Sequence, residues 1–311
     1  MQDIQASNRR MTDLLDRLIV HEGAFPSSLD GVRLMRSERS MPRAPVLYEP
    51  SIVIVGQGRK RGYLGNRVYT YDPHNYLVLS VPMPFECEVE VGPDGPFLGI
   101  AIAVDLAVLY ELMTKMERKP LPSGWQDEHG MCSTPLDPML SEATVRLLEC
   151  LSSPMDAQVL GPQIVREITY RVLCGEHGDS LRALIALNGR LSQIQRVVGE
   201  IHVNYSQNFD VASLAEHAGM SVSAFHRSFK SVTASSPLQY LKAIRLHKAR
   251  MLMVQEGIGA GLAANRVGYE STSQFSREFK RFFGATPLDE ASRVRGYLGL
   301  AAPTAEHSAV G

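Results

Sequence analysis

The sequence VGYESTSQFSREFKRFFGATP, residues 267–287, repeats a stretch that occurs earlier in the same chain. The earlier copy is AGMSVSAFHRSFKSVTASSP, residues 218–237. The residues that recur 50 positions later are Phe225, Phe229, Lys230 and Pro237, which return as Phe275, Phe279, Lys280 and Pro287. A repeat of this kind predicts two copies of one small structural unit.

Each copy predicts two helices that are separated by a tight turn. A short helix over 211–218 in the first copy, and over 262–267 in the second, ends at a glycine, where a left-handed turn is least costly. This pairing aligns Leu214 with Leu262. A serine then begins the second helix of each copy, and in the second copy the sequence STSQ, residues 271–274, fits a capping box.

The second helix of each copy has one apolar face and one polar, basic face. Its phenylalanines lie four residues apart, so they share one side of the helix and are expected in the core. The other side carries hydroxyl, amide and guanidinium groups, which can bond to base edges in a major groove. Two such helices around a glycine-containing turn are typical of a helix-turn-helix, and a long helix predicted over 237–254 joins the two units.

These residues resemble a known family. Residues from about 195 to 296 are similar to the AraC/XylS-type DNA-binding domain, and 267–287 match its signature almost position by position. The segments EPSIVIVGQGRKRGYLGNRVYTYDPHNYLVLSVPMP (49–84) and GPFLGIAIAVDLAVLYEL (95–112) resemble the N-terminal effector module of a subgroup of these regulators. The resemblance implies an α+β, two-domain protein. A cupin-like β-barrel with flanking helices would precede an all-α domain with two helix-turn-helix units.

The resemblance also implies that the two second helices enter adjacent major grooves on one face of duplex DNA. Carried over to this chain, the residues expected to contact bases are Ser223, His226, Arg227, Thr272, Ser273, Gln274 and Arg277. Those expected to contact phosphates are Ser221, Lys230, Ser271, Lys280 and Arg281. Side-chain chemistry agrees, because arginine can bond guanine O6 and N7 as a fork and glutamine can pair with adenine.

The N-terminal part predicts short strands and then helices. Between about Val32 and Val104, short β-branched or aromatic segments are broken by Gly, Pro, Asn and Asp, which is typical of an antiparallel sandwich or barrel. In FECEVEV, residues 85–91, apolar residues alternate with glutamates, so one face of that strand is acidic. Helical periodicity is found over 11–24, 106–116, 138–151, 163–175 and 190–205.

Charge is distributed unevenly along the chain. Residues 1–189 carry 18 Lys and Arg against 24 Asp and Glu, whereas residues 190–300 carry 14 against 8. A basic C-terminal third favours a polyanionic partner for that third. The predicted parts are an effector-sensing and dimerisation domain (1–185), a linker (186–195), a DNA-binding domain (196–298, with helix-turn-helix units at about 211–232 and 260–283) and a disordered tail (299–311).

The composition excludes several classes of protein. Hydrophobic residues make up 44% of the chain and charged residues 21%, as in ordinary folded proteins. The longest apolar stretch, 97–104, is far shorter than the ~20 residues of a membrane helix, and the N-terminus shows no secretory signal. The four cysteines form no CxxC pair, so we expect neither a zinc site nor disulfides, and a cytoplasmic location.

The role of the N-terminal domain leaves alternatives open. A metal-dependent cupin-type enzyme with a helical accessory domain needs clustered ligands, but His21, His74, His129 and His177 are dispersed, so we expect no metal and no cofactor. We expect an unknown small-molecule effector, with RNA polymerase and a second copy of the chain as further candidate partners. Alternatively, the barrel only dimerises and DNA binding is constitutive. Cys87 is expected to be a buried inert thiol, with an electrophile or oxidant sensor as the alternative.

Overall fold

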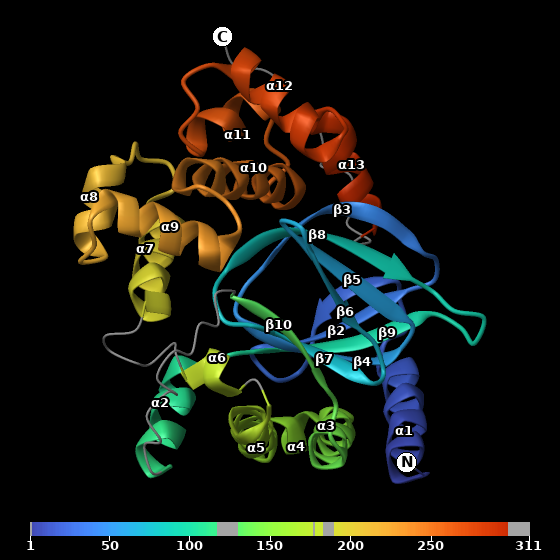
Figure 1. Cartoon of the computed structure of the whole chain (residues 1–311). Coiled ribbons are helices and arrows are strands. Elements are labelled where there is room, and N and C mark those ends of the chain that lie inside the picture. Colours follow the sequence, from blue (N-terminus) through green and yellow to red (C-terminus); the bar gives the residue numbers. More distant parts are fainter. Residues whose placement is uncertain (1, 117–129, 177, 183–189, 298–311) are drawn as a thin grey trace.

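The chain forms two domains, which lie one above the other in Figure 1. The computed structural model describes residues 2–116, 130–176, 178–182 and 190–297. The N-terminal domain contains two β-sheets and several helices, and the described part of the C-terminal domain is helical. The expected tail lies outside the described residues, as does the first part of the expected linker. The rest of that linker, from Arg190 onward, is already helical.

The N-terminal domain is built on two antiparallel sheets. The six-stranded sheet has the order β1 (Gly23–Pro26), β2 (Val32–Ser37), β9 (Phe97–Ala103), β4 (Ser51–Gln57), β7 (Asn75–Leu79) and β10 (Met131–Pro135). The four-stranded sheet has the order β3 (Met41–Tyr48), β8 (Met83–Glu90), β5 (Arg59–Leu64) and β6 (Arg67–Tyr71). The predicted sandwich or barrel is confirmed. The edge strands β1 and β10 are not predicted, because they are too short to show an alternating pattern.

The main apolar core of this domain lies between its sheets. Strand β4 is buried along almost its whole length, and in β8 buried and partly buried residues alternate as predicted. Cys87 is buried, as expected, and its Sγ lies 3.4 Å from the hydroxyl of Tyr71. The acidic face of β8 points outward and is paired with arginines of neighbouring strands. The pairs are Glu86 with Arg43, Glu88 with Arg61, and Glu90 with Arg59 and Arg61.

Helices cover the six-stranded sheet on the side away from the C-terminal domain (Figure 1). They are α3 (Pro138–Leu151), α4 (Pro154–Val159) and α5 (Gly161–Cys174). Helix α2 (Leu106–Lys115) follows β9, and α6 (Gly178–Arg182) contacts α2 and α5 beside the sheet. The first helix, α1 (Gln2–Leu18), packs against α3 and β4. The helix predicted over 11–24 therefore begins and ends too late. The first turns of α1 are mostly polar in sequence, so its apolar periodicity becomes visible only from Met11 and Leu15, which are buried.

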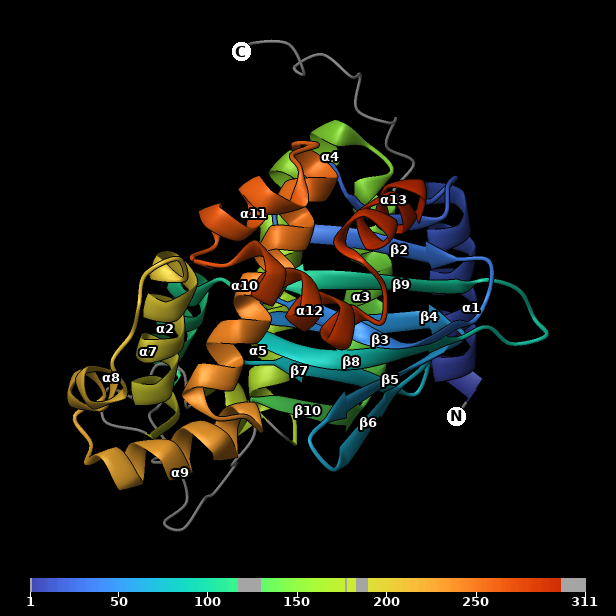
Figure 2. The ribbon, with the colours of Figure 1, turned by 90° about the horizontal axis from the view of Figure 1, so that it is seen from above.

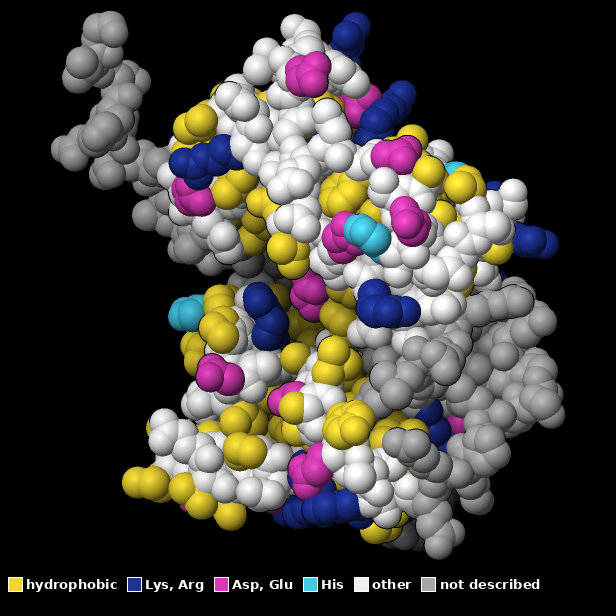
Figure 3. Space-filling view, turned by 90° about the vertical axis from the view of Figure 1, so that its left-hand side faces the viewer, with side chains coloured by type: hydrophobic (Ala, Val, Ile, Leu, Met, Phe, Trp, Pro, Cys, Tyr) yellow, Lys and Arg dark blue, Asp and Glu magenta, His cyan; other side chains and the backbone are white. Residues whose placement is uncertain are grey.

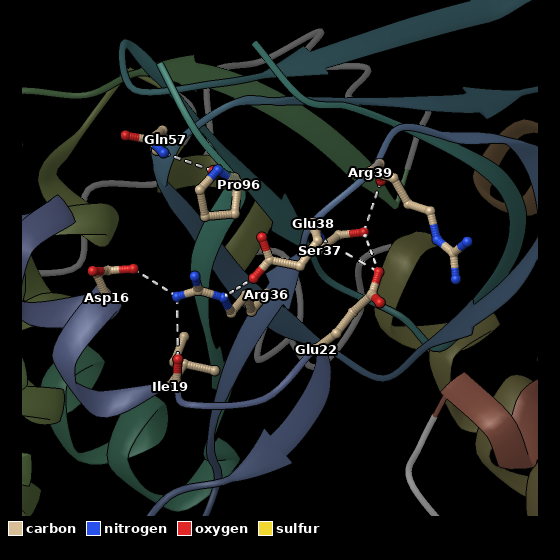
Figure 4. Close-up of polar contacts among 9 residues, drawn as sticks. All are labelled: Asp16, Ile19, Glu22, Arg36, Ser37, Glu38, Arg39, Gln57 and Pro96. Carbon is tan, nitrogen blue, oxygen red and sulfur yellow. Dashed lines mark hydrogen bonds and ion pairs between the residues drawn. The ribbon is translucent and has the colours of Figure 1, made fainter. Parts of the chain in front are cut away.

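Polar contacts hold α1 and the start of the sheet together (Figure 4). The guanidinium of Arg36 on β2 donates to Asp16 Oδ1 at 2.6 Å and to the carbonyl of Ile19 at 3.2 Å. Beside it, the Ser37 hydroxyl donates to the carbonyl of Arg39 at 2.9 Å. The two Arg36 bonds fix the chain at the point where it leaves α1 and enters β1.

The C-terminal domain consists of seven described helices. They are α7 (Arg190–Asn204), α8 (Val211–His217), α9 (Val222–Thr233), α10 (Pro237–Gln255), α11 (Ala260–Arg266), α12 (Thr272–Phe283) and α13 (Pro287–Tyr297). Helix α10 begins with a capping box between Ser236 and Gln239 that the sequence analysis does not predict. Seen from above, α10 and α12 lie over β3 and β8 (Figure 2), and α12 contacts β3 directly.

The two halves of the C-terminal domain differ in how they join the rest of the molecule. The core of α7 to α9 is continuous with the core of the N-terminal domain, whereas α11 and α12 pack around a core of their own. Two hydrogen bonds strengthen the first connection. Tyr240 donates its hydroxyl hydrogen to the carbonyl of Pro82 at 2.6 Å, and the amide of Gly130 donates to the carbonyl of Val232 at 3.1 Å.

Candidate nucleic-acid interface

In the first repeat, α8 and α9 meet at a turn made by Gly219. This glycine has φ +64°, a left-handed conformation that side chains disfavour. Asp210 caps α8, and Ser221 caps α9 by accepting a hydrogen bond from a backbone N–H in its first turn at 3.3 Å. Phe225 and Phe229 are fully buried beneath α9. The caps and the buried rings together fix which face of α9 points to solvent.

In the second repeat, the turn between α11 and α12 is more crowded. Gly268 has φ +86°, and a Cβ added there would lie 2.2 Å from the carbonyl oxygen of Ser206. Ser271 caps α12 by accepting a hydrogen bond from the backbone N–H of Gln274 at 3.3 Å. The predicted capping box is only half formed, because the Gln274 side chain donates to Glu278 instead, at 3.2 Å.

The alignment of Leu214 with Leu262 is wrong. Leu214 is 2% exposed, but Leu262 is 50% exposed, and the buried residue at the equivalent place is Ala263. Helix α11 begins at residue 260, so α8 and α11 align when Gly219 is matched with Gly268. The second turn is then one residue longer than the first, since its serine cap lies three residues after the glycine rather than two.

The phenylalanines of the repeat form the core of each unit, as predicted. Phe225 and Phe229 have ring centroids 5.5 Å apart, and Phe275 and Phe279 have centroids 5.4 Å apart. All four are fully buried, and Phe283 is partly buried under the guanidinium of Arg250 at 4.6 Å. These rings therefore serve packing and cannot stack on bases.

The residues predicted to contact bases all lie on the outer faces of α9 and α12, and all are exposed: Ser223, His226, Arg227, Thr272, Ser273, Gln274 and Arg277. Within the described part of the chain, Arg227 and Arg277 make no ion pair or side-chain hydrogen bond. Their guanidinium groups can therefore bind an external acceptor without breaking an internal bond.

The residues predicted to contact phosphates fall into three groups. The hydroxyls of Ser221 and Ser271 already accept hydrogen bonds from the backbone as helix caps. Lys230 and Lys280 are exposed on the C-terminal halves of α9 and α12. Arg281 is also exposed, but it lies toward the N-terminal domain and lines a cavity between the two domains.

This interdomain cavity is a feature that the sequence does not predict. Its volume is about 490 Å³, and both domains line it. Tyr63, Phe85 and Glu86 contribute from the sheet, and Lys242, Arg281 and Phe282 contribute from α10 and α12. The cavity combines apolar rings with charged groups, and it touches the same helix that carries four of the predicted base contacts.

Glu278 is the other feature that sequence reasoning missed. Its carboxylate accepts hydrogen bonds from Lys242 Nζ at 2.8 Å, from the Tyr269 hydroxyl at 2.9 Å and from Gln274 Nε2 at 3.2 Å. Burial alone raises the pKa of Glu278, but these three bonds outweigh it and hold the pKa below its usual value. The spacing of Gln274 and Glu278 on one helix face was a usable signal, whereas Lys242 is too distant in sequence.

Positive charge is not gathered into one continuous patch on the face seen in Figure 3. Lys and Arg side chains stand apart there, and Asp and Glu side chains lie among them. The view also shows a hollow between the upper and lower parts of the molecule, lined by hydrophobic and acidic side chains. On this face, the positive excess of the C-terminal third is therefore interrupted by acidic groups.

Two family models match the chain. The model described as an AraC-type transcriptional regulator N-terminus matches residues 28–180, and the model described as a helix-turn-helix domain matches residues 214–292. The chain belongs to the AraC family of transcriptional regulators. It is thus a member of a family of DNA-binding regulators, not of enzymes, and the expected resemblance to AraC/XylS-type proteins is confirmed.

Curated HTH-type transcriptional regulators match parts of the chain. The RCS-specific HTH-type transcriptional activator RclR of Escherichia coli is 39% identical over 85 residues, 27% of this chain and 30% of that protein. The HTH-type transcriptional regulator CdhR of Pseudomonas aeruginosa is 28% identical over 154 residues, 48% of this chain and 45% of that protein. The chain therefore matches less than half the length of either relative.

A solved structure of ToxT from Vibrio cholerae, with an unsaturated fatty acid bound, has the same fold. The two structures align with a TM-score of 0.60 and 13% identity, covering 92% of this chain and 100% of ToxT. The expected architecture, a β-rich N-terminal domain followed by a helical one, is confirmed. None of the helices in the described ranges is long and apolar enough to cross a bilayer.

Proposed function

We propose that this AraC-family protein is a sequence-specific transcription regulator that places α9 and α12 in adjacent major grooves of its promoter sites. The observation that carries this proposal is the exposure and pairing of the Arg227 and Arg277 side chains. Each stands exposed on a helix whose opposite face is anchored by buried phenylalanines, and each is free of internal partners among the described residues. Such an arginine is suited to a forked bond with guanine.

The other proposed contacts follow from the same two helix faces. Bases would be read by Ser223, His226, Arg227, Thr272, Ser273, Gln274 and Arg277, and phosphates bound by Ser221, Lys230, Ser271, Lys280 and, from the rim of the interdomain cavity, Arg281. The DNA-binding part would extend over about 196–298 and the effector part over 1–185. The two serines would use backbone N–H groups at the helix N-termini as well, because their hydroxyls serve as caps.

The test is the salt dependence and the sequence preference of binding by the full chain. Duplexes chosen from a randomised library should bind more tightly than scrambled duplexes, and log affinity should fall linearly with log salt concentration. The matched control is the double variant Arg227→Ala, Arg277→Ala, which should keep weak, salt-dependent binding but lose most of the preference. Binding that is indifferent to salt or to sequence would refute the proposal.

We further infer that the N-terminal domain responds to a small-molecule effector, in the cytoplasm and without a metal. Three observations support this. The domain matches the AraC-type N-terminal model, the same fold in ToxT holds an unsaturated fatty acid, and the 490 Å³ cavity has the size of a ligand site. A ligand in that cavity would touch α12, so its affinity would depend on where α12 lies. RNA polymerase and a second copy of the chain are the further partners we propose.

The effector proposal is tested by melting the chelator-treated full chain with a library of small organic molecules, with DNA affinity as a second readout. A true effector should raise the melting temperature and also change DNA affinity. The control is a bulky substitution at the cavity wall, Ala243→Leu, which should weaken the melting shift for that compound. If no compound alters DNA affinity, the constitutive alternative, in which the barrel only dimerises, is favoured.

A further inference from the structure

The base-reading side chain of Gln274 does not stand free on α12. Its Nε2 donates to Glu278 Oε1 at 3.2 Å, one helical turn further on. The same oxygen accepts from Lys242 Nζ at 2.8 Å, while the other carboxylate oxygen accepts from the Tyr269 hydroxyl at 2.9 Å. Glu278 thereby joins α10, the turn before α12, and α12 itself.

We propose that Glu278 is a positioning residue for DNA sequence readout, which orients the Gln274 amide toward the base pair that it reads. This inference rests on the proposed function, because it assumes that α12 enters the major groove. Glu278 itself is only 13% exposed and faces α10, so it would act through Gln274 rather than touch DNA.

The chemistry of the pair decides the orientation of the amide. An ionised carboxylate can only accept hydrogen bonds, so the nitrogen of Gln274 and not its oxygen must face Glu278. One N–H and the carbonyl oxygen of Gln274 then remain for the DNA. These are the donor and acceptor that adenine N7 and N6 require. Fixing the amide also lowers the ordering cost that a flexible glutamine side chain meets on binding.

The anchoring of Glu278 is what makes this orientation reliable. Tyr269 is 8% exposed and cannot move without disturbing the core of the second unit, in which it packs edge-on against Phe275 with ring centroids 5.3 Å apart. Lys242 neutralises the carboxylate, which would otherwise repel the phosphates of an approaching DNA. The first unit lacks this glutamine–glutamate pair, since the positions equivalent to Gln274 and Glu278 are Ala224 and Ser228.

The experiment compares base-preference profiles of full-chain variants, measured by selection from a randomised duplex library. Gln274→Ala identifies the base pair that Gln274 reads, as the position where preference disappears. Glu278→Ala should lower preference at that same position about tenfold, equivalent to about 1.4 kcal/mol. Preference at the position that Arg277 reads should stay within about twofold. Glu278→Gln, which keeps one acceptor but can also donate, should give an intermediate loss.

A structural role for Glu278 makes a different prediction. If Glu278 were only structural, Glu278→Ala would lower affinity for every sequence. If Glu278 is a positioning residue, Glu278→Ala leaves non-specific affinity unchanged or raised, because a negative charge near DNA is removed. Glu270→Ala is the charge-matched control: it removes an exposed carboxylate from the same unit and should leave the profile unaltered. Combining Glu278→Ala with Gln274→Ala should add nothing to the loss at that position.

The outcomes separate this inference from the proposed function. If the unaltered protein shows no sequence preference, the proposed function fails. If it shows a preference, the inference is overturned by any of three results: Gln274→Ala changes no position, Glu278→Ala leaves the profile as it was, or Glu278→Ala weakens all sequences equally. A melting measurement on each variant confirms that the second unit is folded.

Discussion

The two glycines that make the turns of the repeat should respond very differently to the same substitution. Gly219 and Gly268 occupy equivalent places, and both have positive φ, +64° and +86°. A Cβ at Gly219 would have its nearest neighbour 3.9 Å away, at the side chain of Gln193. A Cβ at Gly268 would lie 2.2 Å from the backbone oxygen of Ser206, which cannot swing aside as a side chain can.

The expected magnitudes follow from these geometries. Gly219→Ala forces an alanine into the left-handed region, which costs about 1–2 kcal/mol. Gly268→Ala carries that same strain plus a backbone clash, and relieving such overpacking typically costs a further ~1–3 kcal/mol. The total of about 2–5 kcal/mol is a large share of the ~5–15 kcal/mol that stabilises a typical domain.

Hydrogen exchange followed by mass spectrometry is the appropriate assay, because it reports local opening of each helix pair separately. Gly268→Ala should increase exchange in α11 and α12 by about two orders of magnitude or more, and Gly219→Ala should increase exchange in α8 and α9 by about one. Gly284→Ala is a further control, since its φ is +78° but a Cβ there would meet nothing within 4 Å. Equal effects of Gly219→Ala and Gly268→Ala would refute the reasoning.

Three other predictions concern DNA contacts, the domain junction and pH. Arg277→Ala should relax base choice at one position at a cost of about 1–3 kcal/mol, while Lys280→Ala should weaken all sequences alike; uniform losses in both, measured on point-substituted duplexes, would contradict the assignment. Tyr240→Phe should destabilise the protein by about 1–3 kcal/mol in urea unfolding, because it leaves the carbonyl of Pro82 and the ring nitrogen of His202 without their hydrogen bonds to the Tyr240 hydroxyl. Burial lowers the pKa of His202 to about 4. The unfolded chain therefore binds more protons than the folded one between about pH 6.5 and 4, so stability should fall by up to about 3 kcal/mol as pH drops through that range. The variant His202→Phe should show a shallower fall in the same unfolding measurement, and an unchanged slope would rule His202 out as the cause.

The parts of the fold that could be predicted are those with a local pattern. The phenylalanines four residues apart, the capping serines and the turn glycines are each visible within a dozen residues, so the two helix-turn-helix units follow from them. The same is true of β8, where apolar residues alternate with glutamates. Strand β10 has five residues and no such pattern, and Leu262 looked like a core residue only because the length of the second turn is not visible in the sequence.

The parts of the candidate site that could not be predicted depend on contacts between distant segments. The exposure of Arg227 and Arg277 follows from helical periodicity alone. The bond from Lys242 to Glu278 joins residues 36 positions apart on different helices, and no spacing rule reports it. The sequence pattern predicts that Arg281 lies on the outer side of α12. The packing of α12 on β3 instead places Arg281 at the interdomain cavity.

The arrangement of the two cores determines which part of the molecule an effector could move. The first unit shares one continuous core with the N-terminal domain, so displacing α9 would break buried contacts of Phe229 and Tyr240. The second unit has its own core and meets the sheet through α12, at the edge of the 490 Å³ cavity. A ligand in that cavity would therefore change the position of α12 relative to α9 at lower cost than any movement of the first unit. Because the proposed mode of binding places α9 and α12 in adjacent grooves together, such a shift would alter DNA affinity without changing any residue that is proposed to contact a base.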